Sequence, residues 1–256
     1  MDHELLMSRS QDCLAIVLAA GKGTRMKSEL PKVLVPVCGR PMVRYVLDAL
    51  QAAGIKRTVV VVGYQSEQVQ EELAQVTGLE FVQQHEQLGT GHAVMMCRQQ
   101  LDGHRGPVLV LAGDQCMVQT SSIRKLLKLF QAEQPACLLG TVDREDPTGY
   151  GRIVRDAAGN FAGIVEEKDA TDSERAICEV NVSTYVFDSL DLLVSLERIS
   201  DENAQGEYYL TDCPALMLAK GKKVQAHKVL QPREALSINS MEELQEVEEA
   251  MRGEGV

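Results

Sequence analysis

Leu18-Ala19-Ala20-Gly21-Lys22-Gly23-Thr24-Arg25-Met26 is the strongest local signal in the sequence. It continues an apolar run, Leu14 to Leu18, that is typical of a buried strand. Its glycines allow backbone N–H groups to approach phosphate oxygens, and its two cations neutralise the charge of those oxygens. The stretch therefore predicts a first strand that ends in a phosphate-binding loop.

Two common phosphate-binding motifs do not fit this loop. A dinucleotide fingerprint needs a third glycine where Met26 stands, and an acidic residue at the end of the second strand, where the chain has Gly63-Tyr64-Gln65. A P-loop needs GxxxxGK followed by Ser or Thr, which the sequence does not contain. An NAD-dependent oxidoreductase is therefore disfavoured. A plain turn with solvated cations stays open, because glycine-rich turns are common after strands.

Further apolar runs alternate with amphipathic stretches through the first half of the chain. Between the first two runs, Pro41 to Ala53 has the apolar spacing of a helix, and Gly54 ends it. This alternation predicts an α/β fold: a Rossmann-like mixed, mainly parallel sheet with helices on both faces. The predicted strands are Leu14 to Leu18, Thr58 to Val62, Leu79 to Val82, Val108 to Leu111 and Cys137 to Val142.

The pattern changes after Asp146 to short alternating segments. Arg152 to Arg155 and Phe161 to Glu166 flank a Gly159-Asn160 turn, which predicts an inserted β-hairpin. Near the end, Ser240 and Glu243 form the capping box of a final helix, 240–252. No linker or repeat divides the chain, so we predict a single domain, 1–256.

The composition excludes several classes of protein. The 256 residues carry 26 Lys and Arg against 37 Asp and Glu, a net charge of −11, which argues against binding of nucleic acid. No apolar run approaches the ~20 residues of a membrane helix, and the first residues lack the pattern of a signal peptide. Seven scattered cysteines indicate reduced, structural thiols. We expect a cytoplasmic protein, and the sequence leaves a homo-oligomer open.

The loop and the segments that follow it resemble the sugar-1-phosphate nucleotidyltransferases, in particular the N-acetylglucosamine-1-phosphate uridylyltransferase domain of the bacterial bifunctional enzyme. The resemblance runs from about Leu14 to Asn239, and no hexapeptide repeats of an acetyltransferase follow up to Val256. Its motifs are LAAGKGTRM, Leu30-Pro31-Lys32-Val33-Leu34, Gln84 to Ala93, Gly113-Asp114, Asp146 to Ile153, Ile164 to Ala170 and Gly206 to Asp212.

The resemblance implies a UTP-binding part at about 14–145 and a sugar-binding part, which includes the hairpin, at about 146–239. It implies that Arg25 and Lys32 stabilise charge on the triphosphate. His92, in contrast, is expected only to pack or to cap in the helix after Thr90. The implied nucleotide-binding residues are Leu18, Ala19, Ala20, Gly21, Gly23, Gln84, Gly89, Thr90, Ala112 and Gly113, with Gln84 and Gly89 for uracil and Thr90 also as a helix cap; the implied sugar-binding residues are Gly151, Glu166, Lys168 and Asn181.

Asp114 is also a candidate metal ligand from its position alone. It follows the apolar run Val108 to Leu111, and open α/β sheets bind ligands beyond the carboxyl ends of their strands. An aspartate there is also common as a turn or cap residue. The resemblance gives Asn239 as the second protein ligand, and an oxygen-only, partly hydrated site suits Mg²⁺.

The implied reaction joins UTP and a sugar 1-phosphate, and releases pyrophosphate. Its nucleophile is an ionised phosphate oxygen, so no Ser-His-Asp triad is needed. The chain departs from the family pattern at Val182-Ser183, where uridylyltransferases have Thr-Gly after the asparagine. The sugar therefore stays open between N-acetylglucosamine and another sugar such as glucose. The same chemistry with a different nucleotide also stays open, as does a non-catalytic sensor of nucleotide sugars.

Overall fold

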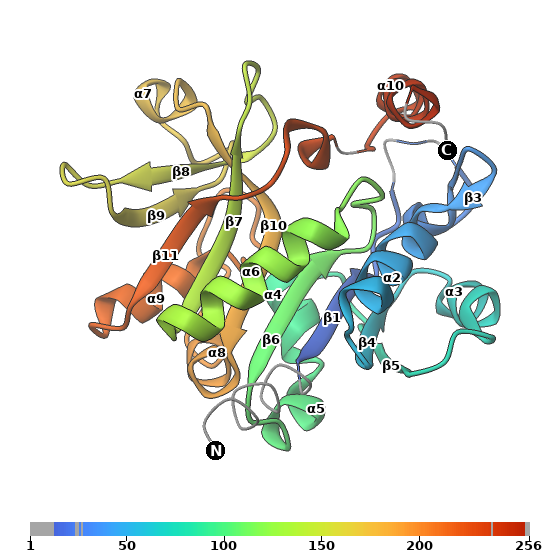
Figure 1. Ribbon diagram of the computed structural model, residues 1–256, viewed down its shortest axis with the longest axis horizontal. Helices are drawn as coiled ribbons and strands as arrows, with labels where there is room; N and C mark the ends of the chain where they lie inside the picture. Colours follow the sequence, from blue (N-terminus) through green and yellow to red (C-terminus); the bar gives the residue numbers. More distant parts are fainter. Residues whose placement is uncertain (1–12, 24–25, 27, 237, 254–256) are drawn as a thin grey trace.

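The predicted first strand is present and is an inner strand of the main sheet. The computed structural model describes residues 13–23, 26, 28–236 and 238–253. The strands of the main sheet follow the order β11-β7-β10-β6-β1-β4-β5 (Figure 1). Their bounds are β1 Leu14–Ala19, β4 Arg57–Val62, β5 Leu79–Gln83, β6 Pro107–Ala112, β7 Cys137–Asp143, β10 Glu179–Asp188 and β11 Val224–Lys228.

The sheet is mixed and mainly parallel, which confirms the predicted fold class. β1 pairs in parallel with β4 and β6, so the carboxyl ends of these strands share one edge. β10 runs antiparallel to both of its neighbours, β6 and β7. The predicted hairpin is also present: β8 (Gly151–Arg155) pairs with β9 (Phe161–Val165). β8 also pairs in antiparallel with β10, which joins the hairpin to the main sheet.

Helices cover both faces of the sheet. Successive residues of a strand point to opposite faces, and in β1 the residues on both faces are apolar. Ala15 and Val17 of β1 face the cluster that holds α2, α3 and α6, whereas Leu14 and Ile16 face α4, α5, α8 and α9 (Figure 1). The helices are α2 Met42–Ala53, α3 Ser66–Leu73, α4 Thr90–Met95, α5 Arg98–Asp102, α6 Thr120–Glu133, α7 Asp172–Arg175, α8 Ser189–Leu196, α9 Asp212–Ala219 and α10 Met241–Arg252, with short 3₁₀ turns η2 Lys32–Leu34 and η3 Pro232–Ala235.

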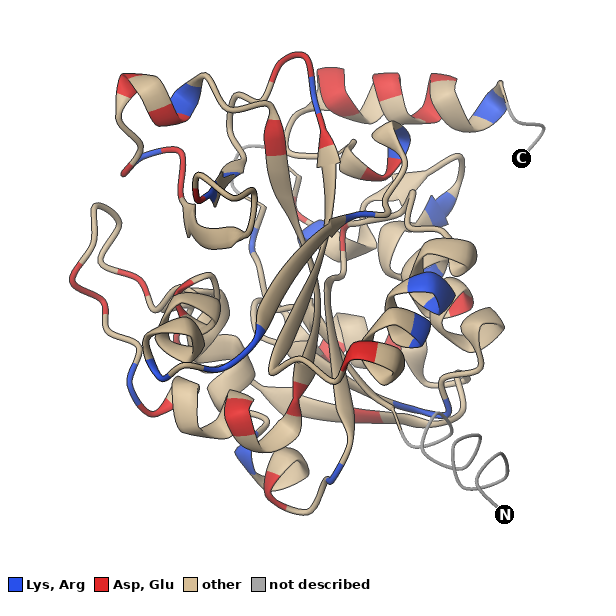
Figure 2. Ribbon diagram, turned by 60° about the vertical axis from the view of Figure 1, so that its left-hand side comes forward, with Lys and Arg blue, Asp and Glu red and all other residues tan. Residues whose placement is uncertain are grey.

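The final helix closes the molecule over a third apolar cluster. Val247 and Met251 of α10 pack with Val37 and Met42 from the small hairpin β2 (Pro36–Val37) and β3 (Arg40–Pro41) and from α2. The predicted capping box is confirmed, since Ser240 Oγ accepts from the Glu243 N–H at 3.2 Å. The acidic residues of α10 form bands along the helix, whereas elsewhere both charge signs are interspersed (Figure 2). The cap fixes the chain just after Asn239.

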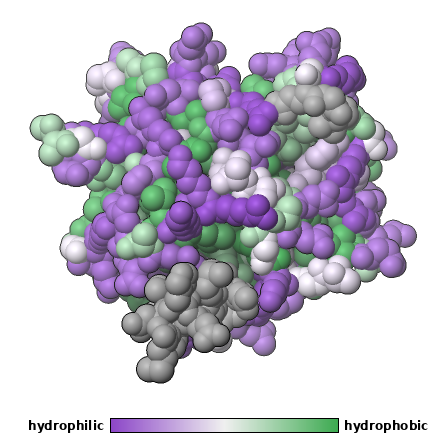
Figure 3. Space-filling model, in the orientation of Figure 1, coloured by the Kyte–Doolittle hydropathy of each residue, from purple (hydrophilic) through white to green (hydrophobic). Residues whose placement is uncertain are grey.

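One face of the molecule is mainly polar. On the face in Figure 3, hydrophilic residues predominate and hydrophobic ones lie between them in small areas. Within the described residues, no helix has the length and apolar character needed to cross a membrane. All seven cysteines are free, as expected, and burial raises the pKa of Cys13, Cys97 and Cys116 to about 12, which leaves these thiols unreactive.

Candidate active site at the carboxyl edge of the sheet

The glycine-rich loop packs directly on Lys32. Gly23 has φ +65°, and a Cβ there would lie 2.8 Å from Lys32 Cβ, so only glycine fits without a shift. The Lys32 N–H also donates to Gly21 O at 3.4 Å. The two motifs that carry the predicted phosphate contacts are therefore one structural unit. Arg25 and Thr24 lie outside the described residues.

Asp114 lies beside this loop because β6 and β1 end together. The Gly113 N–H donates to Leu18 O at 2.8 Å, and a Cβ on Gly113 would come within 2.9 Å of the same oxygen. The absence of a side chain at Gly113 thus brings the turn against β1 and places Asp114 at the shared edge. The predicted nucleotide-binding residues at these strand ends are Leu18, Ala19, Ala20, Gly21, Gly23, Ala112 and Gly113.

Lys32, Asp114 and Asn239 come together from three distant parts of the sequence. Lys32 Nζ forms an ion pair with Asp114 Oδ2 and donates to Asn239 Oδ1 at 2.8 Å. The side chains of Lys32 and Asp114 are 16% and 20% exposed, so the group is accessible but partly shielded from water. Asn239 is held in place by α10, since its N–H donates to the Glu243 carboxylate.

The donor set around Lys32 Nζ fits a hydrated magnesium ion. One carboxylate oxygen and one amide oxygen approach the same cationic group, and Mg²⁺ prefers such oxygens while it keeps several water or phosphate ligands. Within the part of the chain that the structure describes, no group of three or more His, Cys, Asp and Glu could hold a metal ion. Asp114 Oδ2 and Asn239 Oδ1 are therefore the two oxygens at this point that such an ion could use, with water or substrate as its other ligands.

Gln84, the residue predicted for the base, is buried where β5 ends. It is 3% exposed, and its side-chain Nε2 donates to Gly89 O at 3.1 Å and lies 3.1 Å from His92 Nδ1. Gly89 has φ +106°, and a Cβ there would lie 2.6 Å from Tyr208 O. The glycine is therefore required by close packing on the segment at Tyr208, which the sequence did not indicate.

The prediction that Thr90 caps its helix is wrong. α4 begins at Thr90 with Gly89 as the N-cap, and no side chain caps it. Instead, Thr90 Oγ1 accepts from the Leu210 N–H at 3.2 Å, because the 208–210 segment runs alongside this turn. His92 makes a polar contact with Gln84 that the sequence does not predict, because Gln84 precedes the helix and is not at helical spacing from His92.

Three of the predicted sugar-binding residues lie close together. Gly151 of β8 pairs with Asn181 of β10, and a Cβ on Gly151 would lie 3.4 Å from Glu166 Oε2. Glu166 also accepts from Thr211 Oγ1 at 2.9 Å. The fourth residue, Lys168, is exposed and reaches away to Gln205 Oε1 at 2.7 Å.

The surroundings of Glu166 disfavour its ionised form. Burial raises its pKa above the usual 4.5, and the nearby carboxylates of Asp169 and Asp212 add to the effect. The hydrogen bond from Thr211 lowers the pKa and offsets part of the shift. When this buried carboxyl group is ionised, it lacks the water that would otherwise solvate it. Hydrogen bonds from neutral sugar hydroxyls would replace that water.

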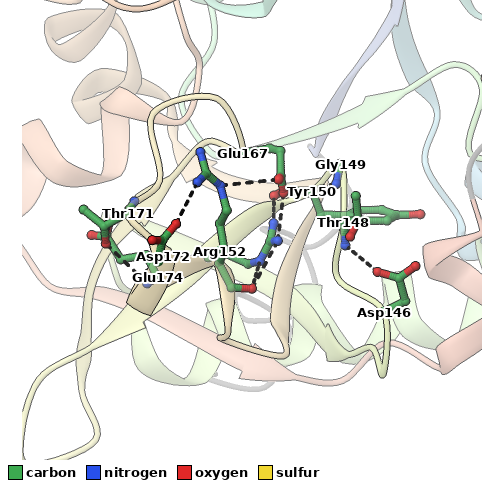
Figure 4. Close-up of polar contacts among 10 residues, drawn as sticks. Asp146, Thr148, Gly149, Tyr150, Arg152, Glu167, Thr171, Asp172 and Glu174 are labelled. Atoms are coloured by element: carbon green, nitrogen blue, oxygen red, sulfur yellow. Dashed lines mark hydrogen bonds and ion pairs between the residues drawn. The ribbon is translucent and has the colours of Figure 1, made fainter.

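A buried arginine holds the sugar-side loops together. Arg152 is 1% exposed, forms an ion pair with Glu167 at 2.8 Å, and donates to Tyr150 O (Figure 4). Glu167 also accepts from the Gly149 N–H at 3.1 Å. Burial alone raises the pKa of Glu167, but the bonds from Arg152 and Gly149 outweigh it and lower that pKa. Arg152 thus ties β8, which begins at Gly151, to the turn after β9 that carries Glu166 and Glu167, a role that the sequence analysis does not predict.

The departure at Val182-Ser183 falls on a bulge of β10. The pairing of β10 with β7 shifts between Asn181 and Tyr185, and Ser183 has φ +56°. Its N–H donates to Asn181 Oδ1 at 3.2 Å. Val182 packs in the apolar core. The glycine of the family pattern therefore corresponds to a left-handed backbone position that Ser183 occupies here.

One protein family matches most of this sequence. The family model described as nucleotidyl transferase matches residues 14–231. The chain belongs to the nucleotidyl transferase family. In this family member, the matched region contains the glycine-rich loop, Asp114, the base-side turn and the sugar-side hairpin, whereas Asn239 lies beyond it.

Curated relatives place the chain more narrowly. It is 47% identical over 242 residues to the Bifunctional protein GlmU of Pelotomaculum thermopropionicum, with 94% of this chain and 52% of that protein covered. It is 44% identical over 238 residues to the Bifunctional protein GlmU of Listeria innocua, with 93% and 52% covered. The chain therefore spans about half the length of the curated relatives it matches.

A solved structure shares the fold at low sequence identity. The crystal structure of UDP-glucose pyrophosphorylase complexed with UDP-glucose matches with a TM-score of 0.76 and 19% identity, over 94% of this chain and 98% of that one. The match agrees with the mixed sheet of this nucleotidyl transferase family member.

Proposed function

We propose that the chain is a sugar-1-phosphate uridylyltransferase that forms UDP-N-acetylglucosamine and pyrophosphate from UTP and N-acetylglucosamine 1-phosphate. The observation that carries the proposal is the convergence of Lys32, Asp114 and Asn239 beside the glycine-rich loop. Similarity to the two GlmU proteins supports the choice of reaction class. A cytoplasmic location and the oligomeric state stay predictions.

In the proposed reaction, a phosphate oxygen of the sugar 1-phosphate attacks the α-phosphorus of UTP. A bond from that oxygen to the α-phosphorus forms, the bond between the α-phosphorus and the bridging oxygen breaks, and pyrophosphate leaves with the electron pair. The reacting groups are all anionic; at ~4 Å and an effective dielectric of ~20, each pair of like charges costs about 4 kcal/mol. Control of charge is therefore the main task of the site.

The residues of the chain divide this task. Lys32 and Arg25 would stabilise the charge that develops on the α-phosphate and on pyrophosphate. Asp114 and Asn239 would hold Mg²⁺, which supplies charge neutralisation and alignment of the attacking and leaving oxygens. Backbone groups at Gly21 and Gly23 would approach the triphosphate, since no side chain blocks them.

The two ends of the substrates would be held by separate groups. Gln84 and Gly89 lie where the base would bind, on the side of the sheet that carries β4 and β5. Gly151, Glu166 and Asn181 lie on the hairpin side and would contact the sugar hydroxyls. Lys168 is 2.7 Å from Gln205 in the free chain, so a role at the sugar phosphate would require it to leave that partner.

The second candidate is the same chemistry with glucose 1-phosphate. The observation that favours it is the backbone at Ser183, where a residue with a Cβ has a left-handed conformation beside Asn181, the proposed sugar ligand. A side chain in place of glycine at this position would leave less room for a sugar substituent, and an N-acetyl group needs more room than a hydroxyl.

The deciding experiment is release of pyrophosphate from UTP with Mg²⁺, with the two sugar phosphates compared side by side and EDTA as the control. Metal-dependent release with N-acetylglucosamine 1-phosphate would support the full proposal. Preference for glucose 1-phosphate would keep the mechanism and change the sugar. Binding of UTP without release of pyrophosphate with either sugar would favour the non-catalytic sensor and overturn the proposal.

A further inference from the structure

The amide of Gln84 has both of its N–H groups directed at protein acceptors. Nε2 donates to Gly89 O at 3.1 Å and lies at the same distance from His92 Nδ1. Among the described residues, none donates a hydrogen bond to Gln84 Oε1. The oxygen is therefore the part of this amide that is left for a ligand, and an amide oxygen only accepts hydrogen bonds.

His92 determines the direction of that oxygen. An amide held at one N–H can still turn about that contact, whereas two contacts in its plane fix the plane and thus the carbonyl oxygen. Because an amide nitrogen only donates, His92 Nδ1 must accept, and the ring proton of the neutral imidazole lies on Nε2. His92 is thus the second of two anchors on a side chain that is 3% exposed.

The surroundings hold His92 in this orientation. The ring of Tyr208 lies 6.2 Å from the ring of His92, centroid to centroid. The Tyr208 N–H donates to Leu88 O and the Gly91 N–H donates to Tyr208 O, both at 2.8 Å, so backbone bonds lie on either side of Gly89. Both anchors of Gln84 therefore belong to one rigid turn.

We propose that His92 is a positioning residue that makes the base site selective for uracil over cytosine. The N3 atom of uracil carries a hydrogen that a fixed amide oxygen can accept, whereas N3 of cytosine is itself an acceptor and would face Gln84 Oε1 without a hydrogen between them. A site built to bind an N–H group discriminates strongly against an analogue that lacks it. The inference rests on the proposed function and deepens it at the base.

The test compares UTP and CTP in the full chain carrying either of two substitutions. His92→Phe keeps a ring of similar size but removes the acceptor, and His92→Asn keeps an acceptor near the position of Nδ1. For His92→Phe we expect about a tenfold weaker UTP affinity and higher KM for UTP, with kcat nearly unchanged, since about one hydrogen bond is lost. The preference for UTP over CTP should fall by a similar factor, and His92→Asn should restore most of it.

Calorimetric binding of the two nucleotides is measured beside turnover, so that the two proposals can fail separately. A parent chain that binds UTP in preference to CTP but releases no pyrophosphate would overturn the proposed function alone. If His92→Phe has the same ratio of UTP affinity to CTP affinity as the parent chain, the role of His92 is overturned, whatever the stability of the variant. A His92→Asn variant that is no better than His92→Phe would overturn it as well. His227→Phe, on the edge strand β11, is the matched control and should leave the ratio unchanged.

Discussion

Lys32 Nζ lies 2.8 Å from Asn239 Oδ1, although 207 positions separate the two residues in the sequence. The same ammonium forms an ion pair with Asp114, so one cation holds together both oxygens that we propose as ligands of a metal. In a chain with a net charge of −11, a local positive charge at this point is what triphosphate binding requires.

Lys32→Met is expected to lower kcat by about 10²–10³, because one preorganised donor to the developing charge is lost. Stability should change by only about 1 kcal/mol, since the ion pair is partly solvated. Steady-state kinetics and thermal unfolding of the same preparation measure the two effects. Lys223→Met removes a more exposed ion pair, to Glu133 at 3.0 Å, and should leave kcat unchanged. Equal kcat in Lys32→Met and the parent would exclude the role.

Asp114→Asn is expected to raise the half-saturating Mg²⁺ concentration about tenfold or more, because the carboxylate charge at the site is removed while the shape is kept. Chelation by EDTA should abolish turnover of the parent, and added Mg²⁺ should restore it. Titration of activity with Mg²⁺ gives the comparison. The control is Asp143→Asn, which alters an exposed carboxylate paired with Lys228 at 2.8 Å. A shift of equal size in both variants would refute the assignment.

The position of Asp114 could be predicted because it depends on local sequence. A β-branched run predicts a strand, and the residue after a strand lies at the carboxyl edge of a parallel sheet. The same reasoning located β1, β4, β5 and the hairpin to within a few residues. Glycine positions also carried information, since Gly23 and Gly113 are required by contacts that only glycine allows.

Contacts between distant turns could not be predicted in the same way. β10 has polar residues such as Asn181, Ser183 and Thr184 at a bulge, so its apolar pattern is interrupted. Thr90 was expected to cap its helix, but the neighbouring 208–210 segment uses its hydroxyl. The burial of Arg152 depends on Glu167 from the other side of the hairpin, and a charged residue alone gives no signal for such a pairing.

Glu166→Gln and Glu167→Gln are expected to change stability in opposite directions near pH 7.5. Burial and nearby carboxylates raise the pKa of Glu166, so its ionisation costs stability as pH rises through that pKa; Glu166→Gln should therefore stabilise the fold at pH 7.5. This gain should vanish below about pH 4.5, where the glutamate is protonated in both states. The KM for the sugar phosphate should still rise about tenfold, since a strong acceptor is lost.

For Glu167 the sign reverses, because bonds from Arg152 and Gly149 outweigh burial and lower its pKa. Its ionised form stabilises the fold at pH values above the usual glutamate pKa of 4.5, and that contribution is lost as pH falls through the lowered pKa. Glu167→Gln should cost about 2 kcal/mol at pH 7.5, less than for a fully buried pair, since Glu167 is 29% exposed. Urea unfolding of both variants at pH 7.5 and pH 4 measures the four values, and equal signs at pH 7.5 would contradict the account.

Ser183→Gly is expected to be more stable than Ser183→Ala by about 1 kcal/mol, because a residue with a Cβ is strained at φ +56° and glycine is not. Comparison of the two variants cancels the loss of the serine hydroxyl, which both share. At Ser195, which lies within α8, the order should reverse, because glycine within a helix lowers the stability by about 0.5–1 kcal/mol relative to alanine. Chemical unfolding of the four variants gives the two differences. A Ser183→Gly variant that is less stable than Ser183→Ala would show that the bulge is not strained.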